Sequence, residues 1–352
     1  MADAYAIIMA GGNGERFWPM STPERPKQFV SIFGGKPLIR HAADRMRGLI
    51  SPERTLVITA ERLVAQTRKA LPQVPRGNII GEPCRRDTAA AVACACGLVK
   101  RLGGRDAVGC ILTADQLMEP VVKFRQTLRD AIRVASRTDA IVTMGIKPNY
   151  PATGFGYIEC GSRMATGTPT EFHAVRRFVE KPDEKTAKRY LKSGRFCWNS
   201  GMFIWKASVM EGAFVQHAPD IAGLIGQVES AKSVRATLMS AYPPLRAISF
   251  DYAVMEKTRK VVVARSAFKW DDVGSWTALP AHFPEDKAGN TCLGNTALMD
   301  TNDSIVVSED GHLTAVLGME DVVVVQMSGA TLVCAKNRVQ DIKKLVRSLP
   351  VR

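Results

Sequence analysis

Residues 5–28 read YAIIMAGGNGERFWPMSTPERPKQ, and this stretch decides the fold. The apolar run of residues 6–10 has the length of one buried strand, and Gly11, Gly12 and Gly14 follow it directly. Glycines let the backbone approach a phosphate closely and expose its amide donors. The pattern therefore predicts a first buried strand that leads into a loop suited to a phosphate group.

The loop departs from two common phosphate-binding motifs. Phe17 stands where the dinucleotide fingerprint has its third glycine, and no Gly-Lys-Ser or Gly-Lys-Thr follows. Gly-x-Gly by itself is equally compatible with a plain tight turn. Two cations follow, however: Arg16 can bind two phosphate oxygens, and Lys27 supplies a point charge. Both are suited to neutralising charge that builds during phosphoryl or nucleotidyl transfer.

Outward from this loop, the first half of the chain alternates strand and helix patterns. We expect strands at residues 5–9, 55–59, 78–80, 108–113 and 140–145, and helices at 37–47, 61–71, 88–102 and 121–136. Such alternation predicts an α/β fold with a Rossmann-like, mostly parallel sheet flanked by helices. Ligands of such folds gather beyond the carboxyl ends of the strands, here after Met9, Ile80 and Thr113.

The tail of the chain changes character. Short β-type runs at residues 304–307, 313–317, 321–326 and 331–335 are separated by turn signals, and a helix is expected at 339–349. We therefore predict a catalytic domain of residues 1–284 and a small β-rich C-terminal domain of residues 285–352. In the middle third of the chain, strands are expected at 155–159, 172–180 and 198–205, and helices at 186–192 and 207–217.

Composition narrows the class of protein. The formal net charge of +14 suggests an anionic partner, but the charges form no long blocks and aromatic residues make up only 7%. We therefore expect phosphorylated small molecules and no nucleic acid. The first apolar run is too short for a secretory signal or a membrane span, so no membrane association is expected. Eight scattered cysteines without metal-ligand spacing favour a reducing cytoplasm.

Eight stretches of the chain, beginning with the glycine loop, resemble the sugar-nucleotide pyrophosphorylases, and among these the bacterial mannose-1-phosphate guanylyltransferases. The stretches follow the family's order at residues 9–30, 81–91, 113–115, 153–159, 178–183, 198–203, 249–258 and 270–276. The resemblance implies the nucleotide-diphospho-sugar transferase fold. It also implies the short form of the family, because 352 residues leave no room for the isomerase domain of its longer members.

The reaction implied by the resemblance joins GTP and mannose 1-phosphate into GDP-mannose and pyrophosphate. A phosphate oxygen of the sugar attacks the α-phosphorus in line. This nucleophile is already anionic, so catalysis reduces to alignment and charge neutralisation, with Arg16, Lys27 and Asp115 as the expected catalytic residues. The resemblance assigns Asp115 and Asp272 to Mg²⁺, a cation that prefers oxygen ligands. Asp271 is an alternative ligand, and Gln116 stands where many relatives have histidine.

The remaining site residues are also assigned through the resemblance. Glu82 is expected to choose the base, because a carboxylate accepts the adjacent N1–H and N2–H₂ of guanine and repels the acceptor edges of pyrimidines. The other expected nucleotide-binding residues are Ala10, Gly11, Gly12, Asn13, Gly14, Arg86, Asp87 and Thr88. For Asp87, a helix cap is the structural alternative. The expected sugar-phosphate-binding residues are Gly154, Tyr157, Glu180, Lys181, Asn199 and Gly201.

Two other functions stay open at this point. One is nucleotidyl transfer to a different sugar 1-phosphate, because epimers differ by a single hydroxyl. The other is a non-catalytic regulatory subunit that binds nucleotide-sugars, although such a chain would be expected to lose Arg16, Lys27 or a metal aspartate. The β-rich tail has strand edges that need covering, so we expect a homodimer.

Overall fold

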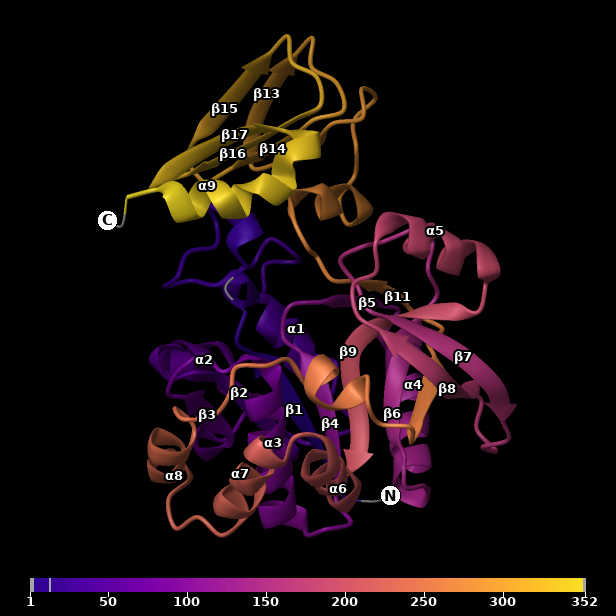
Figure 1. Cartoon of the computed structure of the whole chain (residues 1–352). Coiled ribbons are helices and arrows are strands. Elements are labelled where there is room, and N and C mark those ends of the chain that lie inside the picture. The colour runs from indigo at the N-terminus through magenta and orange to yellow at the C-terminus, as the bar shows by residue number, and fades with distance from the viewer. Residues whose placement is uncertain (1–2, 13, 351–352) are drawn as a thin grey trace. The chain divides into compact units, whose positions relative to one another are not determined.

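The computed structural model describes residues 3–12 and 14–350 of the chain (Figure 1). Its backbone divides into two compact units. The sheet unit comprises Met1–Gly11, Ala42–Ala114 and Met118–Trp270, and the loop–tail unit comprises Gly12–His41, Asp115–Leu117 and Asp271–Arg352. Compactness thus groups residues 12–41 with the tail, whereas the boundary at 284/285 stays a prediction.

The sheet unit is built on a nine-stranded sheet in the order β3-β2-β1-β4-β9-β6-β10-β8-β7, with a further pairing of β9 and β7. The first four strands are mutually parallel, as are β6 and β10, whereas β7, β8 and β9 pair antiparallel. The strands are β1 (Ala4–Ala10), β2 (Thr55–Ala60), β3 (Ile79–Glu82), β4 (Val108–Thr113), β6 (Ile141–Ile146), β7 (Tyr157–Met164), β8 (Phe172–Val179), β9 (Phe196–Lys206) and β10 (Val261–Arg265).

Helices cover both faces of this sheet, as the buried strands require. One core contains side chains of α3, α6 and α7, and the other contains Phe124, Leu128 and Ile132 from one stripe of α4. The helices are α1 (Leu38–Asp44), α2 (Val64–Ala70), α3 (Asp87–Gly103), α4 (Val121–Arg137), α5 (Glu184–Ser193), α6 (Ala207–His217), α7 (Pro219–Glu229) and α8 (Val234–Ala241). The short strands β5 (Leu117–Glu119) and β11 (Lys269–Asp271) lie outside the large sheet.

The loop–tail unit stacks short strands in parallel, in the manner of a β-helix. One sheet has the order β12-β14-β16-β17 and the other pairs β13 with β15; only β16 and β17 run antiparallel. Phe17 lies in the same core as Trp276 and Ile305, which explains why the part of the glycine loop after Gly11 belongs to this unit. The elements are β12 (Thr291–Leu293), β13 (Asn295–Met299), β14 (Ile305–Ser308), β15 (Leu313–Leu317), β16 (Val322–Met327), β17 (Ala330–Ala335) and α9 (Ile342–Ser348).

The predicted fold class is confirmed, and the differences concern individual elements. The structure adds elements that the sequence patterns did not predict, namely α7, α8, β5, β10, β11, β12 and β13. In α7, two glycines lower the helix propensity, and packing against α3 outweighs that loss. The expected closing helix begins at Ile342, after a 3₁₀ turn over Lys336–Asp341.

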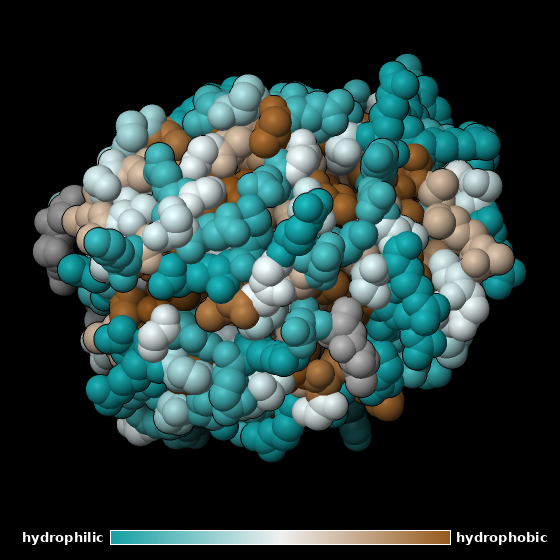
Figure 2. Space-filling view, turned by 90° about the horizontal axis from the view of Figure 1, so that it is seen from below, coloured by the Kyte–Doolittle hydropathy of each residue, from teal (hydrophilic) through white to brown (hydrophobic). Residues whose placement is uncertain are grey.

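The surface is predominantly polar on the face shown in Figure 2, where apolar residues form small separate groups among hydrophilic ones. Over the described part of the chain, none of the helices combines the length and the apolar character that a membrane crossing needs. The hydrophobic residues of the strands and of the helix stripes are instead used in the interior cores.

Close packing of α3 on α7 gives a first prediction. A Cβ at Gly97 would lie 2.6 Å from the Ile225 carbonyl oxygen and 2.8 Å from Val228 Cβ, so Gly97→Ala should lower the stability by about 1–3 kcal/mol. The matched control is Gly212→Ala in α6, where an added Cβ meets open space and should raise stability by about 0.5–1 kcal/mol. Urea unfolding midpoints check both variants; equal shifts of the two would contradict the tight contact.

Candidate active site

A buried ammonium group lies at the centre of the candidate site. Lys27 is 6% exposed, and its Nζ donates to Asp115 Oδ2 at 3.0 Å and to the Asp272 carbonyl oxygen at 2.5 Å. All three residues belong to the loop–tail unit, although they lie far apart in the sequence. The structure therefore brings together two of the predicted catalytic residues and the second predicted metal ligand.

The two adjacent aspartates, Asp271 and Asp272, differ in their surroundings. Asp271 Oδ1 accepts the Val273 N–H at 2.7 Å, and its Oδ2 lies 2.8 Å from His282 Nε2. Burial is the main cause that raises the pKa of the Asp272 carboxyl; the Asp271 and Asp115 charges add to it, and Lys27 and Arg16 oppose it. Asp271 thus holds the turn, whereas the Asp272 carboxylate is the group that gains from an added cation.

Backbone strain accompanies this turn. Val273 has a φ of 47°, which is unusual for a β-branched residue and costs energy of order 1–3 kcal/mol. The side chain of Val273 is fully buried in the core of the loop–tail unit. At the next residue, the Gly274 carbonyl oxygen accepts a hydrogen bond from Arg16 Nη1 at 3.3 Å. Core packing of Val273 and this hydrogen bond to Gly274 therefore hold the turn after Asp272 in a conformation that the local sequence does not favour.

The glycine loop divides into parts with different demands. Ala10 ends β1 and Gly11 follows it, while Gly12 offers open space around its Cα. Gly14 has a φ of 63°, and its carbonyl oxygen accepts the Ser21 hydroxyl at 2.6 Å. Asn13 was also predicted to bind the nucleotide, but it lies outside the described residues. Gly14 thus shapes the loop, and Gly12 leaves room beside it.

The predicted base-selecting residue, Glu82, is the last residue of β3 and lies in the sheet unit. Its carboxylate accepts a hydrogen bond from the hydroxyl of the buried Tyr242. Burial raises the pKa of Glu82 to about 7, although the Tyr242 hydrogen bond and the Arg85 charge oppose this shift. The carboxylate is therefore poorly solvated and gains from a ligand that donates hydrogen bonds.

The neighbouring nucleotide-binding candidates are engaged with the protein itself. Arg86 donates from Nε to the Pro243 carbonyl oxygen at 2.8 Å, and Thr88 Oγ1 accepts the Phe250 N–H at 2.8 Å. Asp87 begins α3 with a φ of 58°, and its Oδ1 accepts the Thr88 N–H. Arg86 and Thr88 thus hold residues 243–250 against the start of α3, whereas Asp87 bonds within the first turn of α3. Direct contact with a nucleotide stays a prediction for these three residues.

Several sugar-phosphate candidates lie in the sheet unit near the carboxylates of Glu180 and Asp251. The Glu180 side chain is 8% exposed, and its Oε1 lies 2.6 Å from Nζ of the more exposed Lys181. Burial alone would lower the pKa of Lys181, but the bond and charge of Glu180 outweigh it and raise the pKa. Asn199 Oδ1 accepts the Gly201 N–H at 3.2 Å, where Gly201 has a φ of 74°.

Asp251 is a candidate residue that the sequence patterns missed. Asn199 Nδ2 donates to Asp251 Oδ1 at 3.1 Å. Burial, and after it the Glu180 charge, raises the pKa of Asp251 to about 7. The available signal was an acid inside the otherwise apolar run of residues 250–255, which is unusual for a buried segment.

Two further predicted sugar-phosphate-binding residues, Tyr157 and Gly154, lie apart from this group of polar side chains. Tyr157 is fully buried in the core that contains α4, and its ring packs 5.4 Å from that of Tyr190. Its side chain thus serves packing, and a direct contact of Tyr157 with the sugar phosphate stays a prediction. Gly154 lies exposed in the loop before β7, where an added Cβ would meet nothing within 4 Å.

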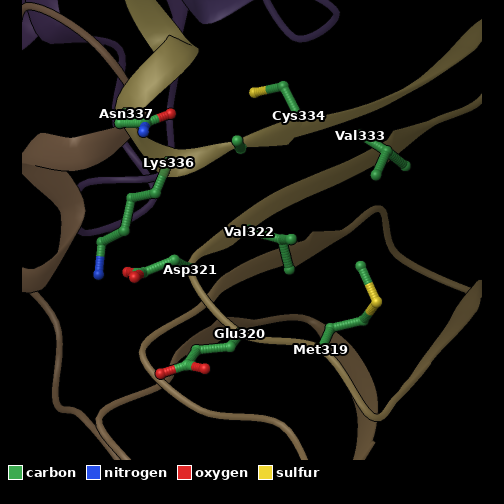
Figure 3. A pocket seen from close by; sticks show the side chains of 9 residues that line it. Met319, Glu320, Asp321, Val322, Val333, Cys334, Lys336 and Asn337 are labelled. Atoms are coloured by element: carbon green, nitrogen blue, oxygen red, sulfur yellow. The ribbon is translucent and has the colours of Figure 1, made fainter.

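A hollow of about 640 Å³ lies in the tail, beside β16 and β17, with Val322, Val333 and Lys336 in its lining (Figure 3). None of the predicted site residues belongs to its lining. Its side chains present no cluster of cations for a triphosphate, so it does not compete with the candidate site.

Comparison with known proteins adds the family. The nucleotidyl transferase family matches residues 5–288, and the MannoseP isomerase/GMP-like beta-helix domain matches residues 294–349. Mannose-1-phosphate guanylyltransferase 2 of Escherichia coli O157:H7 is 38% identical over 365 residues, which cover 100% of this chain and 75% of that protein. Mannose-1-phosphate guanylyltransferase of Klebsiella pneumoniae is 37% identical, with 97% and 73% covered.

Solved structures show the same architecture. A Thermus thermophilus structure described as a mannose-1-phosphate geranyltransferase superposes with a TM-score of 0.88 at 31% identity, and 98% of each chain is covered. A Helicobacter pylori structure described as a mannose-6-phosphate isomerase has a TM-score of 0.61 at 24% identity, over 76% of this chain and 99% of that chain. At that identity the second likeness shows the fold alone.

The glycine loop gives a second prediction. A Cβ at Gly14 would overlap Lys27 Cβ and approach Lys27 N and Cα to 3.0 Å, so Gly14→Ala should cost about 2–5 kcal/mol in stability. Gly12→Ala is the matched control, because open space surrounds it, and should change stability by no more than about 0.5 kcal/mol. Chemical denaturation of both variants checks this; a Gly14→Ala variant as stable as the control would rule out the close approach to Lys27.

Proposed function

The chain belongs to the nucleotidyl transferase family and to its mannose-1-phosphate guanylyltransferases, and we propose that it transfers GMP from GTP to mannose 1-phosphate, giving GDP-mannose and pyrophosphate. The observation that carries the proposal is the Lys27 cluster, in which one buried cation lies against Asp115 and Asp272. A cation held by two acceptors in a water-poor site is suited to stabilising the charge of a transferring phosphoryl group.

The chemistry needs no general base from the protein. A phosphate oxygen of the sugar forms a bond to the α-phosphorus, the bond from that phosphorus to the bridging oxygen breaks, and pyrophosphate leaves with the electron pair. Lys27 and Arg16 would neutralise the triphosphate, and the amides around Gly11 and Gly12 would bind its oxygens. Lys181 would bind the sugar phosphate. Glu180 would accept hydrogen bonds from sugar hydroxyls, and Asn199 would donate to them or accept from them.

Asp115 and Asp272 are the residues that would hold Mg²⁺. Burial is the main cause that raises the pKa of the Asp272 carboxyl, and the Asp271 and Asp115 charges add to it, so a bound divalent cation would stabilise the charged carboxylate. When bound, the ion would polarise phosphate oxygens and offset negative charge. The donor set of two aspartates fits an ion that completes its coordination with phosphate oxygens and water.

The catalytic test is direct. Purified protein with Mg²⁺, GTP and mannose 1-phosphate should release pyrophosphate, measured by a coupled phosphate assay across a panel of nucleotides and sugar 1-phosphates. The Asp115→Asn variant should lose about 10²-fold or more in kcat, and its circular dichroism spectrum should match that of the unchanged protein. Absence of turnover with every pair would reject the enzyme and leave the regulatory subunit as the remaining function. Preference for another sugar phosphate would reject mannose.

Glu82 gives a pH prediction. Guanine needs the charged carboxylate, and the pKa of Glu82 is raised to about 7, so KM for GTP should rise about tenfold between pH 8 and pH 6. In Glu82→Gln the part of this rise in KM that comes from Glu82 should vanish. The titration of GTP itself affects both proteins equally, so it cancels when their pH profiles are compared. Tyr242→Phe removes a hydrogen bond that lowers the pKa, so the midpoint should move to higher pH. Identical profiles of the three proteins would exclude Glu82 from base binding.

We also propose a homodimer in the cytoplasm. The outward face of the β13–β15 pair exposes Ala297, Met299, Leu313, Ala315 and Leu317, an apolar surface that a second copy would cover. Light scattering after gel filtration should give about twice 38.4 kDa, and Leu317→Lys should shift the mass toward the monomer. A monomeric unchanged protein would reject this arrangement.

The proposal of a cytoplasmic location is supported by the eight cysteines, which are all free thiols.

A further inference from the structure

Two cysteines with no role in the proposed reaction face each other in the sheet unit. Cys160 lies on β7 and Cys197 on β9, and their sulfur atoms are 3.6 Å apart. The two strands pair antiparallel from Tyr157 to Glu159, and the Cys160 N–H then donates to the Arg195 carbonyl oxygen. The thiols are therefore diagonal neighbours on one face of the sheet.

The backbone around the pair is not a regular ladder. The register of β7 against β8 shifts on both sides of Cys160, which marks a bulge. Bulges re-aim side chains and interrupt pairing, so this stretch can adjust more readily than a regular strand. On the other strand, Cys197 is 2% exposed and lies over Gly145, where a Cβ would come within 2.8 Å of Cys197 Cβ.

The two sulfurs differ in reactivity. Cys160 is partly exposed, and the hydrogen bond from Cys197 is the main cause that lowers the pKa of Cys160 to about 7; burial opposes this, and His173 and Arg265 add positive charge. Burial raises the pKa values of Cys94, Cys96 and Cys110 instead. The thiolate is the reactive form, so Cys160 is the nucleophile of the pair and Cys197 its resolving partner.

We propose that Cys160 and Cys197 are a redox modification site, in which a hydroperoxide converts the thiol pair into a reversible disulfide. The Cys160 thiolate attacks one peroxide oxygen, the O–O bond breaks, and a sulfenic acid and hydroxide form. The Cys197 sulfur then attacks Cys160, the S–O bond breaks, and the proton of Cys197 leaves with that oxygen as water. In sum, two thiols and one H₂O₂ give one disulfide and two waters.

The disulfide would act on the neighbouring sugar-phosphate candidates, a consequence that rests on the proposed function. A disulfide needs sulfurs about 2.05 Å apart, so the two strands must draw together from the present 3.6 Å. Asn199 lies two residues beyond Cys197 on the same face of β9, and it connects Gly201 with Asp251. A shift of Cys197 therefore displaces the amide that is expected to contact the sugar.

The test of the site itself is chemical. The protein is treated with hydrogen peroxide, free thiols are alkylated, and the digest is examined by mass spectrometry. A cross-linked peptide joining Cys160 and Cys197 should appear and vanish on reduction with dithiothreitol. Cys160→Ser and Cys197→Ser should lack it, whereas the control Cys334→Ser, at a partly exposed cysteine of the tail, should retain it. Sulfinic acid at Cys160 without any cross-link would overturn the proposal.

The functional consequence is measured separately. Oxidation should raise KM for mannose 1-phosphate by about tenfold and leave KM for GTP unchanged, because displacement of a positioning group by about 1 Å can cost up to 10²-fold. Both serine variants should keep the reduced-state kinetics under peroxide. Equal loss with both substrates, or a cross-link without any kinetic change, would overturn the link to the sugar site. If no substrate pair turns over, the mass-spectrometric result still decides whether the disulfide forms.

Discussion

The buried charge of the Lys27 ammonium group is the constraint on which the candidate active site depends. A buried charge must be paired, because its desolvation is otherwise too costly. Lys27 finds one acceptor in the Asp115 carboxylate and another in the Asp272 carbonyl oxygen, so a single side chain joins three distant chain segments. Removing either acceptor would leave the buried charge with fewer partners.

The same physical theme recurs at the two proposed recognition sites. Glu82 and Asp251 are carboxyls whose pKa values burial raises to about 7. Their neutral partners include Tyr242 for Glu82 and Asn199 for Asp251. A ligand with hydrogen-bond donors, such as a guanine edge or a sugar hydroxyl, supplies the solvation that the protein withholds. Binding and selectivity then both come from the incomplete hydrogen bonding of the buried carboxylates, because a ligand without those donors leaves the carboxylate unsatisfied.

The tail contributes more than an appended β-domain. Phe17 of the glycine loop packs 4.9 Å from the ring of Trp276, and Trp276 Nε1 donates to the Trp18 carbonyl oxygen at 3.1 Å. Through these contacts, residues of the glycine loop share a core with Ile305 and Val323 of the stacked strands. The stability of the tail and the conformation of the loop are therefore coupled by packing within one unit.

Much of this was determined by the sequence alone. Strand and helix periodicity predicted the α/β sheet, and the run from Gly11 to Lys27 predicted a phosphate-binding loop, because hydrophobic spacing and glycine content are local properties. Only the tertiary structure decided that Tyr157 lies in a core and that Asp251 meets Asn199. Burial and hydrogen-bond partners come from residues far along the chain, so no local pattern encodes them.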